Sequence, residues 1–167
     1  MYKMQQINLY IEADRIMAVG RLTELLLLVV MSVKDIREHK VSVAMLSLSG
    51  TLAGISILLE VIKKGGLAWR AHVVGLIIGM LFLGMSWITR EALGYGDSCL
   101  LCILGLYLGG WMMLGLLIMT WLYTAVLAGI ALVRKRFRKK TVIPMIPCIL
   151  AGYVTVCLEE VILFTKV

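Results

Sequence analysis

The chain has 167 residues, of which 61% are hydrophobic, and its mean hydropathy is +0.97. Soluble domains are nearer about half apolar, so this composition excludes a soluble enzyme and predicts an all-α integral membrane protein in a lipid bilayer. The net charge of +7 does not indicate a nucleic-acid partner, because six of the seventeen basic residues fall in one run, Arg134–Lys140, between apolar segments. Such a run is typical of a cytoplasmic loop, and aromatic residues are not interleaved in the way that a nucleic-acid groove requires.

The N-terminal region combines a polar arm with a first membrane span. Residues 1–15 are mixed and charged, which predicts an interfacial or extracytoplasmic arm without a secretory signal. The first span is expected at about 16–33. It has to include Arg21 and Glu24, because the apolar stretch after them is too short to cross a bilayer. Spaced three apart on a helix, these two side chains are expected to pair.

Two further spans are expected at about 41–62 and 71–88. Each carries two glycines four residues apart, a spacing that lets neighbouring membrane helices approach closely. The four glycines are Gly50, Gly54, Gly75 and Gly79. The sequence therefore predicts close helix packing at these positions.

The uninterrupted apolar run Ser98–Val133 is too long for one crossing. As a single helix its 36 residues would measure about 54 Å, against a hydrocarbon core of about 30 Å. We expect a break near Gly109-Gly110 or Gly115, which gives spans at about 98–113 and 115–133.

A sixth span is expected at about 142–164, and its start carries both prolines of the chain, which a first helical turn tolerates. Residues 1–167 then form a single polytopic domain, a bundle of about six transmembrane helices. With the N-terminus outside, the inner loops carry ten basic residues, whereas the outer side and the first span carry seven. This distribution agrees with the positive-inside rule.

Two aspartates stand at the ends of expected spans. Asp35 ends the first span and Asp97 begins the fourth, so two crossings separate them and both belong to the same membrane face. An ionisable group at a membrane boundary is by default a functional candidate. Two carboxylates held close together share a proton, and such a pair can activate a water for attack on a peptide carbonyl. On the residues alone, two separate solvated acids are an equally open interpretation, with Asp35 paired to Lys34 or Arg37.

The four cysteines do not indicate a metal site. Two of them have C-x-x-C spacing, but no second pair exists and both histidines are isolated, whereas zinc needs four convergent ligands. The cysteines are Cys99, Cys102, Cys148 and Cys157. We expect them to act as small apolar side chains, with no metal and no organic cofactor.

The motif Gly94-Tyr95-Gly96-Asp97 is similar to the G-x-G-D motif of intramembrane aspartyl proteases. Nearly the whole chain resembles the type IV prepilin peptidases, in the short form that serves tight-adherence (Flp-type) pili. A first aspartate, Asp35, follows the first span in a basic loop, and the G-x-G-D motif precedes an apolar helix with Gly105 and Gly109. A basic loop then leads into IPMIPCILAG, residues 143–152, which resembles the family's proline-containing entry to its last helix.

The resemblance implies a membrane protease, an aspartyl endopeptidase of the bacterial cytoplasmic (inner) membrane with its active site facing the cytoplasm. Its catalytic residues would be Asp35 and Asp97, and the motif residues Gly94, Tyr95 and Gly96 would lie beside the substrate. The substrates would be prepilin or pseudopilin proteins of type IV pili and protein secretion, which lose a short, positively charged leader. Longer family members carry a methyltransferase region with paired C-x-x-C motifs, so the resemblance implies a peptidase without that activity. A homodimer stays open.

The sequence departs from the family pattern at two places, and two other functions stay open. Residues 39–42 read His-Lys-Val-Ser where the family often has Ile-Pro-Asn, and Cys99 stands where a lysine is frequent. A small proton-coupled transporter would use Asp35 and Asp97 as relay groups, although the two halves of the chain show no convincing repeat. A catalytically silent partner of a secretion system would depend on the glycine-rich faces and on neither aspartate. Four glutamates have no assigned role: Glu24, Glu60, Glu159 and Glu160.

Overall fold

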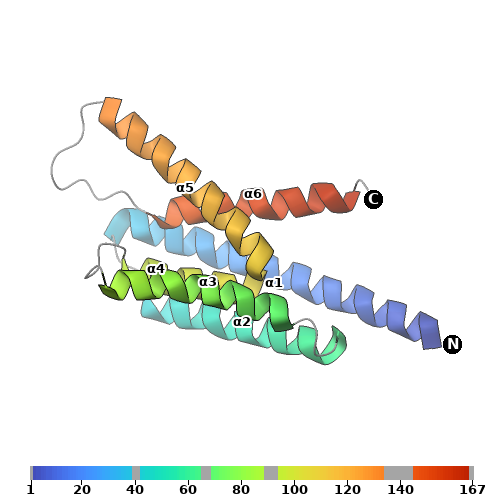
Figure 1. Ribbon diagram of the computed structural model, residues 1–167. Coiled ribbons are helices and arrows are strands. Elements are labelled where there is room, and N and C mark those ends of the chain that lie inside the picture. The colour runs from blue at the N-terminus through green and yellow to red at the C-terminus, as the bar shows by residue number, and fades with distance from the viewer. Residues whose placement is uncertain (1, 39–41, 65–68, 89–93, 134–144, 166–167) are drawn as a thin grey trace.

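The computed structural model describes residues 2–38, 42–64, 69–88, 94–133 and 145–165. These ranges form six α-helices and contain no strand. The helices are α1 (Tyr2–Glu38), α2 (Val43–Lys64), α3 (Trp69–Ile88), α4 (Tyr95–Leu108), α5 (Gly110–Val133) and α6 (Ile146–Thr165). The all-helical prediction is therefore confirmed for the described chain (Figure 1).

Three helices are long and apolar enough to cross a membrane. Their candidate spans are Val43–Ile62 in α2, Trp69–Ile88 in α3 and Gly110–Ile130 in α5. The fourth helix, α4, is apolar but has only 14 residues, or about 21 Å at 1.5 Å per residue. The protein is thus an all-helical membrane protein with at least three helices able to span, and the crossings expected for α1, α4 and α6 stay predictions.

The first helix is longer than the sequence predicted. Helix α1 runs without a break from Tyr2 to Glu38, 37 residues in all, so the expected arm at residues 1–15 is helical and continuous with the first span, and its interfacial or extracytoplasmic location stays a prediction. Residues 2–15 contain no proline or glycine, so nothing interrupts the main-chain hydrogen bonds of the helix. The N-terminal end of α1 extends beyond the other helices (Figure 1).

The long apolar run breaks at Gly109, between α4 and α5. Gly109 has a φ of 78°, which L side chains rarely adopt. Its N–H closes α4 on the carbonyl of Gly105 at 3.1 Å, and its own carbonyl accepts the N–H of Met113 at 3.0 Å. The break predicted near Gly109-Gly110 is confirmed. It turns the chain back, so that the C-terminal end of α5 lies at the same end of the bundle as the start of α4 (Figure 1).

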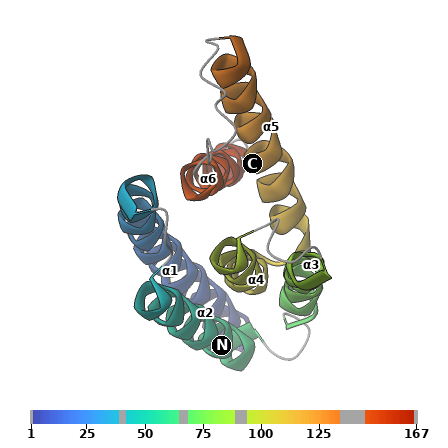
Figure 2. The same cartoon turned by 90° about the vertical axis from the view of Figure 1, so that its left-hand side faces the viewer.

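Helix α4 occupies the centre of the bundle, between α2 and α3 and beneath α6 in the view of Figure 2. Its buried side chains form much of the apolar core. They are Leu100, Leu101, Leu104, Tyr107 and Leu108. The position of Asp97 at the start of this helix therefore depends on how α4 packs.

Two of the four expected glycine contacts hold α3 against α4. A Cβ at Gly75 would lie 2.8 Å from the carbonyl carbons of Gly105 and Gly109, and one at Gly79 would lie 2.5 Å from the Cα of Cys102. The backbones of the two helices thus touch, as the spacing predicted.

The prediction of close packing is wrong for α2. A Cβ at Gly54 would meet nothing within 4 Å, and one at Gly50 would make only ordinary contacts of 3.5 Å and more with Ile103. The small-residue spacing permits close approach, but the apolar side chains of the facing helix decide where it occurs.

Candidate active site

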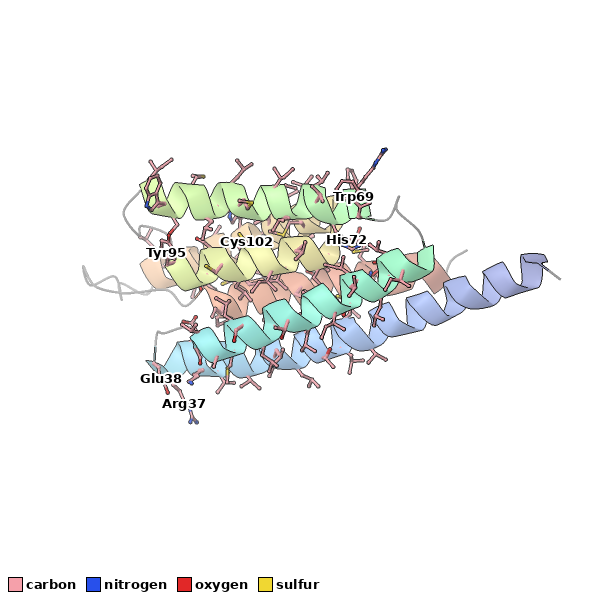
Figure 3. The ribbon with its side chains drawn as sticks, turned by 90° about the horizontal axis from the view of Figure 1, so that it is seen from below. Arg37, Glu38, Trp69, His72, Tyr95 and Cys102 are labelled. Atoms are coloured by element: carbon pink, nitrogen blue, oxygen red, sulfur yellow. The ribbon has the colours of Figure 1, made fainter. Side chains whose placement is uncertain are left out.

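Three helix termini lie at one end of the bundle, here called the aspartate end: the last turn of α1, the first turn of α4 and the first turn of α6. Figure 3 shows Arg37 and Glu38 of α1 at the same end of the molecule as Tyr95 of α4. Both candidate aspartates belong to these turns, Asp35 to α1 and Asp97 to α4. Residues far apart in the sequence are thus brought to one region.

Asp35 lies on the buried face of α1. Buried residues recur along this helix at Leu28, Met31, Ser32 and Asp35, a spacing of three and four that places them on one face. The carboxylate of Asp35 accepts a hydrogen bond from the main-chain N–H of Ile146 at 3.3 Å. Within the described chain, Asp35 therefore bonds to the start of α6, whereas the sequence left Lys34 or Arg37 open as an ion-pair partner.

Asp97 lies in the first turn of α4, ahead of the apolar stretch that begins at Ser98. The chain enters the helix through Gly94, and the N–H of Ser98 donates to the Gly94 carbonyl at 3.1 Å. Partial burial raises the pKa of Asp97 from 3.8 to about 6, and the negative charge of Asp35 contributes to the same increase. The two carboxyl groups are therefore electrostatically coupled, and Asp97 retains its proton to a higher pH than an ordinary aspartate.

The other motif residues surround Asp97 in different ways. A Cβ at Gly94 would stand 3.0 Å from Oδ2 of Asp97, so the absence of a side chain there leaves space beside the carboxyl group. Tyr95 is 48% exposed and points away from the core, while Gly96 is partly buried. Among the described residues, the motif thus leaves space beside Asp97 at Gly94.

This arrangement has the components of an acid–base pair. The carboxylate of Asp35 accepts a hydrogen bond from a main-chain N–H, and the pKa of Asp97 is raised to about 6. Such a pair can hold one proton between two groups and exchange it with a water molecule or a substrate.

A second group of polar side chains lies at the opposite end of the bundle, where Figure 3 shows His72 and Trp69 of α3. His72 is 7% exposed. Its Nδ1 lies 2.9 Å from the carbonyl oxygen of Leu106, and its Nε2 lies 2.9 Å from Oε2 of Glu60. Because a carbonyl only accepts, Nδ1 carries a hydrogen, and the ring joins α2 to the C-terminal turn of α4.

The sequence predicted no partner for His72 and no role for Glu60, whereas the structure pairs the two side chains. Neither residue is close to the other along the chain, so no spacing rule predicts their contact. The one feature of the sequence that indicates such a contact is the position of His72 close to the start of an apolar span, because polar groups inside a membrane bundle are normally paired.

The expected pairing of Arg21 with Glu24 is wrong. Arg21 forms its ion pair with Glu160 of α6, and Glu24 accepts a hydrogen bond from the hydroxyl of Ser49 on α2. Glu24 is 2% exposed, so it faces the neighbouring helix, while Arg21 faces α6. Contacts between helices have replaced the local contact that the spacing predicted.

The described residues contain no group of three or more histidine, cysteine, aspartate or glutamate side chains arranged to hold a metal ion. The four cysteines are not joined in disulfides. His39 and Lys40, where the sequence departs from the prepilin peptidase pattern, lie outside the described residues.

Comparison of the chain with protein-family models, with curated proteins and with solved structures finds no match. The class of protein is therefore defined by the fold alone: a membrane protein whose described residues are helical and include three helices able to span a bilayer. Its function has to be argued from the site.

Proposed function

We propose that this protein is a membrane-embedded aspartyl endopeptidase that removes the N-terminal leader from type IV prepilin-like proteins. Asp35 and Asp97 are its catalytic residues, and the site faces the cytoplasm at the bacterial inner membrane. The observation that carries the proposal is the placement of Asp35 and of Asp97, the aspartate of a G-x-G-D sequence, in helix turns at the same end of the bundle. The raised pKa of Asp97, to which the charge of Asp35 contributes, agrees with it.

The chemistry follows from one proton shared by two carboxyl groups. The ionised carboxylate takes a proton from a water molecule while the water oxygen bonds to the peptide carbonyl carbon. The protonated carboxyl donates its proton to the carbonyl oxygen, which gives a neutral tetrahedral diol. Collapse of the diol re-forms the carbonyl, breaks the C–N bond and transfers a proton to the leaving amine, so the pair returns to its starting state.

Gly94 and Tyr95 support the proposal on steric grounds. An extended peptide needs its backbone close to the carboxyl pair, and the space that Gly94 leaves beside Asp97 allows such an approach. Tyr95, the next residue of the motif, is exposed and so is available to contact a substrate side chain.

Co-expression with a tagged prepilin-type substrate from the same genome tests the proposal. The wild-type protein should release the leader, seen as a size shift, and Asp35→Ala and Asp97→Ala should both abolish the shift while the protein remains inserted. Glu38→Ala is the matched control, because it removes an exposed carboxylate one turn from Asp35. Substantial cleavage by both aspartate variants would disprove the catalytic pair.

A small proton-coupled transporter is the second candidate. The observation in its favour is that ionisable residues are also buried away from the aspartate end, at Glu24 and at His72 with Glu60, since such groups inside a membrane bundle often mark proton pathways. Proton-dependent uptake into sealed vesicles that is lost on Asp97→Asn, with no leader cleavage, would favour this function. A silent secretion-system partner predicts that both aspartates can be replaced without effect.

A further inference from the structure

The first turn of α6 has one main-chain donor that the helix itself does not use. The carbonyl of Met145 accepts the N–H of Cys148 at 3.0 Å and that of Ile149 at 3.1 Å. Pro147 has no N–H. The remaining N–H of the turn belongs to Ile146, and it donates to Asp35. Helix starts leave such donors free, and here the acceptor is a carboxylate from a different helix.

This contact matters because Asp35 occupies an unfavourable position on its own helix. It lies in the last turn of α1, where the helix dipole disfavours a negative charge, and it is 7% exposed. The start of α6 supplies the opposite end of a dipole and a direct hydrogen bond, both of which stabilise the ionised form.

Asp97 is placed differently. It lies in the first turn of α4, where the dipole favours an anion, but no hydrogen-bond donor within the described chain reaches its carboxylate. A charge-assisted hydrogen bond stabilises a carboxylate more than the dipole of a helix does without one. The geometry therefore favours ionisation of Asp35 over ionisation of Asp97.

Few other charged groups belong to this end of the described helices. On α1 they are Lys34, which is partly buried, and the exposed Arg37 and Glu38. Besides Asp97, the starts of α4 and α6 add the phenol of Tyr95 and the thiols of Cys99 and Cys148, and the first turn of α2 and the last turn of α3 add none. The segments 39–41, 89–93 and 134–144, which also carry charges, lie outside the described residues.

We propose that the first turn of α6, through the N–H of Ile146, positions Asp35 and holds it as the ionised member of the pair, so that Asp97 carries the proton. Ile146 is then a positioning residue that acts through its main chain. The catalytic roles rest on the proposed function. In that reaction Asp35 is the base that takes a proton from water, and Asp97 is the acid that donates a proton to the peptide carbonyl. The raised pKa of Asp97 agrees with this assignment.

Ile146→Pro removes the donor with little change to the helix, since proline is well accepted at the first helical position. Ile146→Ala is the matched control, because it also removes the buried side chain but keeps the N–H. Each protein is purified in detergent and labelled with dicyclohexylcarbodiimide, which reacts with protonated carboxyl groups, and the labelled residue is identified by peptide mass spectrometry between pH 4 and 8.

In the wild type and in Ile146→Ala, Asp97 should be labelled at least tenfold faster than Asp35 at pH 5 to 6. In Ile146→Pro, labelling of Asp35 should extend to higher pH by about 1 to 2 units, the size expected for loss of a hydrogen bond to a charged group. Equal labelling of the two aspartates in the wild type, or identical profiles for the proline and alanine variants, would overturn the proposal.

Asp35→Asn gives a test that does not depend on how well the proline variant folds. If Asp35 is ionised, its removal lowers the midpoint of Asp97 labelling by roughly 1 pH unit, because a repelling charge is lost. If Asp97 is the ionised member, this substitution leaves its labelling low and unchanged, which contradicts the proposal.

These measurements use no substrate, so they separate this inference from the proposed function. A protein that cleaves no prepilin but shows the expected labelling has the positioned pair without the peptidase activity. In a protein that does cleave, Ile146→Pro should move the acidic limb of the pH–rate profile upward by the same 1 to 2 units. If the protein cleaves prepilin but Asp35 and Asp97 are labelled equally fast, the peptidase function is supported and this assignment of base and acid is contradicted.

Discussion

Replacing Gly75 by alanine tests whether contact between the backbones of α3 and α4 holds the bundle together. The added Cβ would lie 2.8 Å from the carbonyl carbons of Gly105 and Gly109. The carbonyl oxygen of Gly105 would be closer still, and an ordinary contact needs at least 3.4 Å, so the two helices must separate by about 1 Å or more at this point. Main-chain atoms cannot rotate away as a side chain can, and the separation therefore spreads along the interface.

The cost follows from the lost contacts. A gap of 0.5 to 1 Å removes about a quarter to a half of the dispersion energy of each affected atom pair, and overpacking of this kind costs about 1 to 3 kcal/mol. Alanine also favours the helix over glycine by up to about 1 kcal/mol. Gly84→Ala on the same helix has that gain without the clash, because a Cβ there meets nothing within 4 Å. The difference between the two variants thus isolates the clash.

Thermal unfolding in detergent measures this difference. For a chain of this size, about 2 to 4 °C per kcal/mol gives a melting temperature for Gly75→Ala about 2 to 12 °C below that of Gly84→Ala. Leader cleavage should fall as well, because α4 carries Asp97. If Gly75→Ala and Gly84→Ala melt at the same temperature, the inferred contact between α3 and α4 is wrong.

Three further predictions concern protonation and buried pairs. The proton on Asp97 is present below about pH 6 and lost above it, so kcat/KM for leader removal should fall about tenfold per pH unit above that value; a flat profile from pH 6 to 8 contradicts this. Because folding raises the pKa of Asp97 from 3.8 to about 6, the wild type loses stability as the pH rises from 3.8 and has lost it fully above about pH 6, so Asp97→Asn should be about 1 to 3 kcal/mol more stable than wild type at pH 7.5 and equal to it at pH 3.5, measured by thermal melts. His72→Phe should destabilise the protein by on the order of 2 to 4 kcal/mol, because it leaves Glu60 and the Leu106 carbonyl buried without this partner. The double variant with Glu60→Leu should recover part of the loss in a double-mutant cycle, and strictly additive effects would show that the two side chains are not coupled.

The sequence by itself determined the helical class, the approximate helix positions and a break near Gly109-Gly110 or Gly115, of which the structure has the first. These features depend on local composition: apolar runs too long for one crossing, and a glycine where the chain needs a positive φ. The shared end of Asp35 and Asp97 also follows from the sequence, because helices joined by short loops alternate in direction and two of them separate the aspartates.

The tertiary structure alone decided which residues touch across helices. It gave Arg21 and Glu24 partners on other helices, it placed α3 and not α2 in backbone contact with α4, and it brought the Ile146 amide to Asp35. Each of these contacts depends on the rotation and offset of one helix against another. Those two quantities are fixed by the packing of all the helices together, and no local spacing along the chain specifies them.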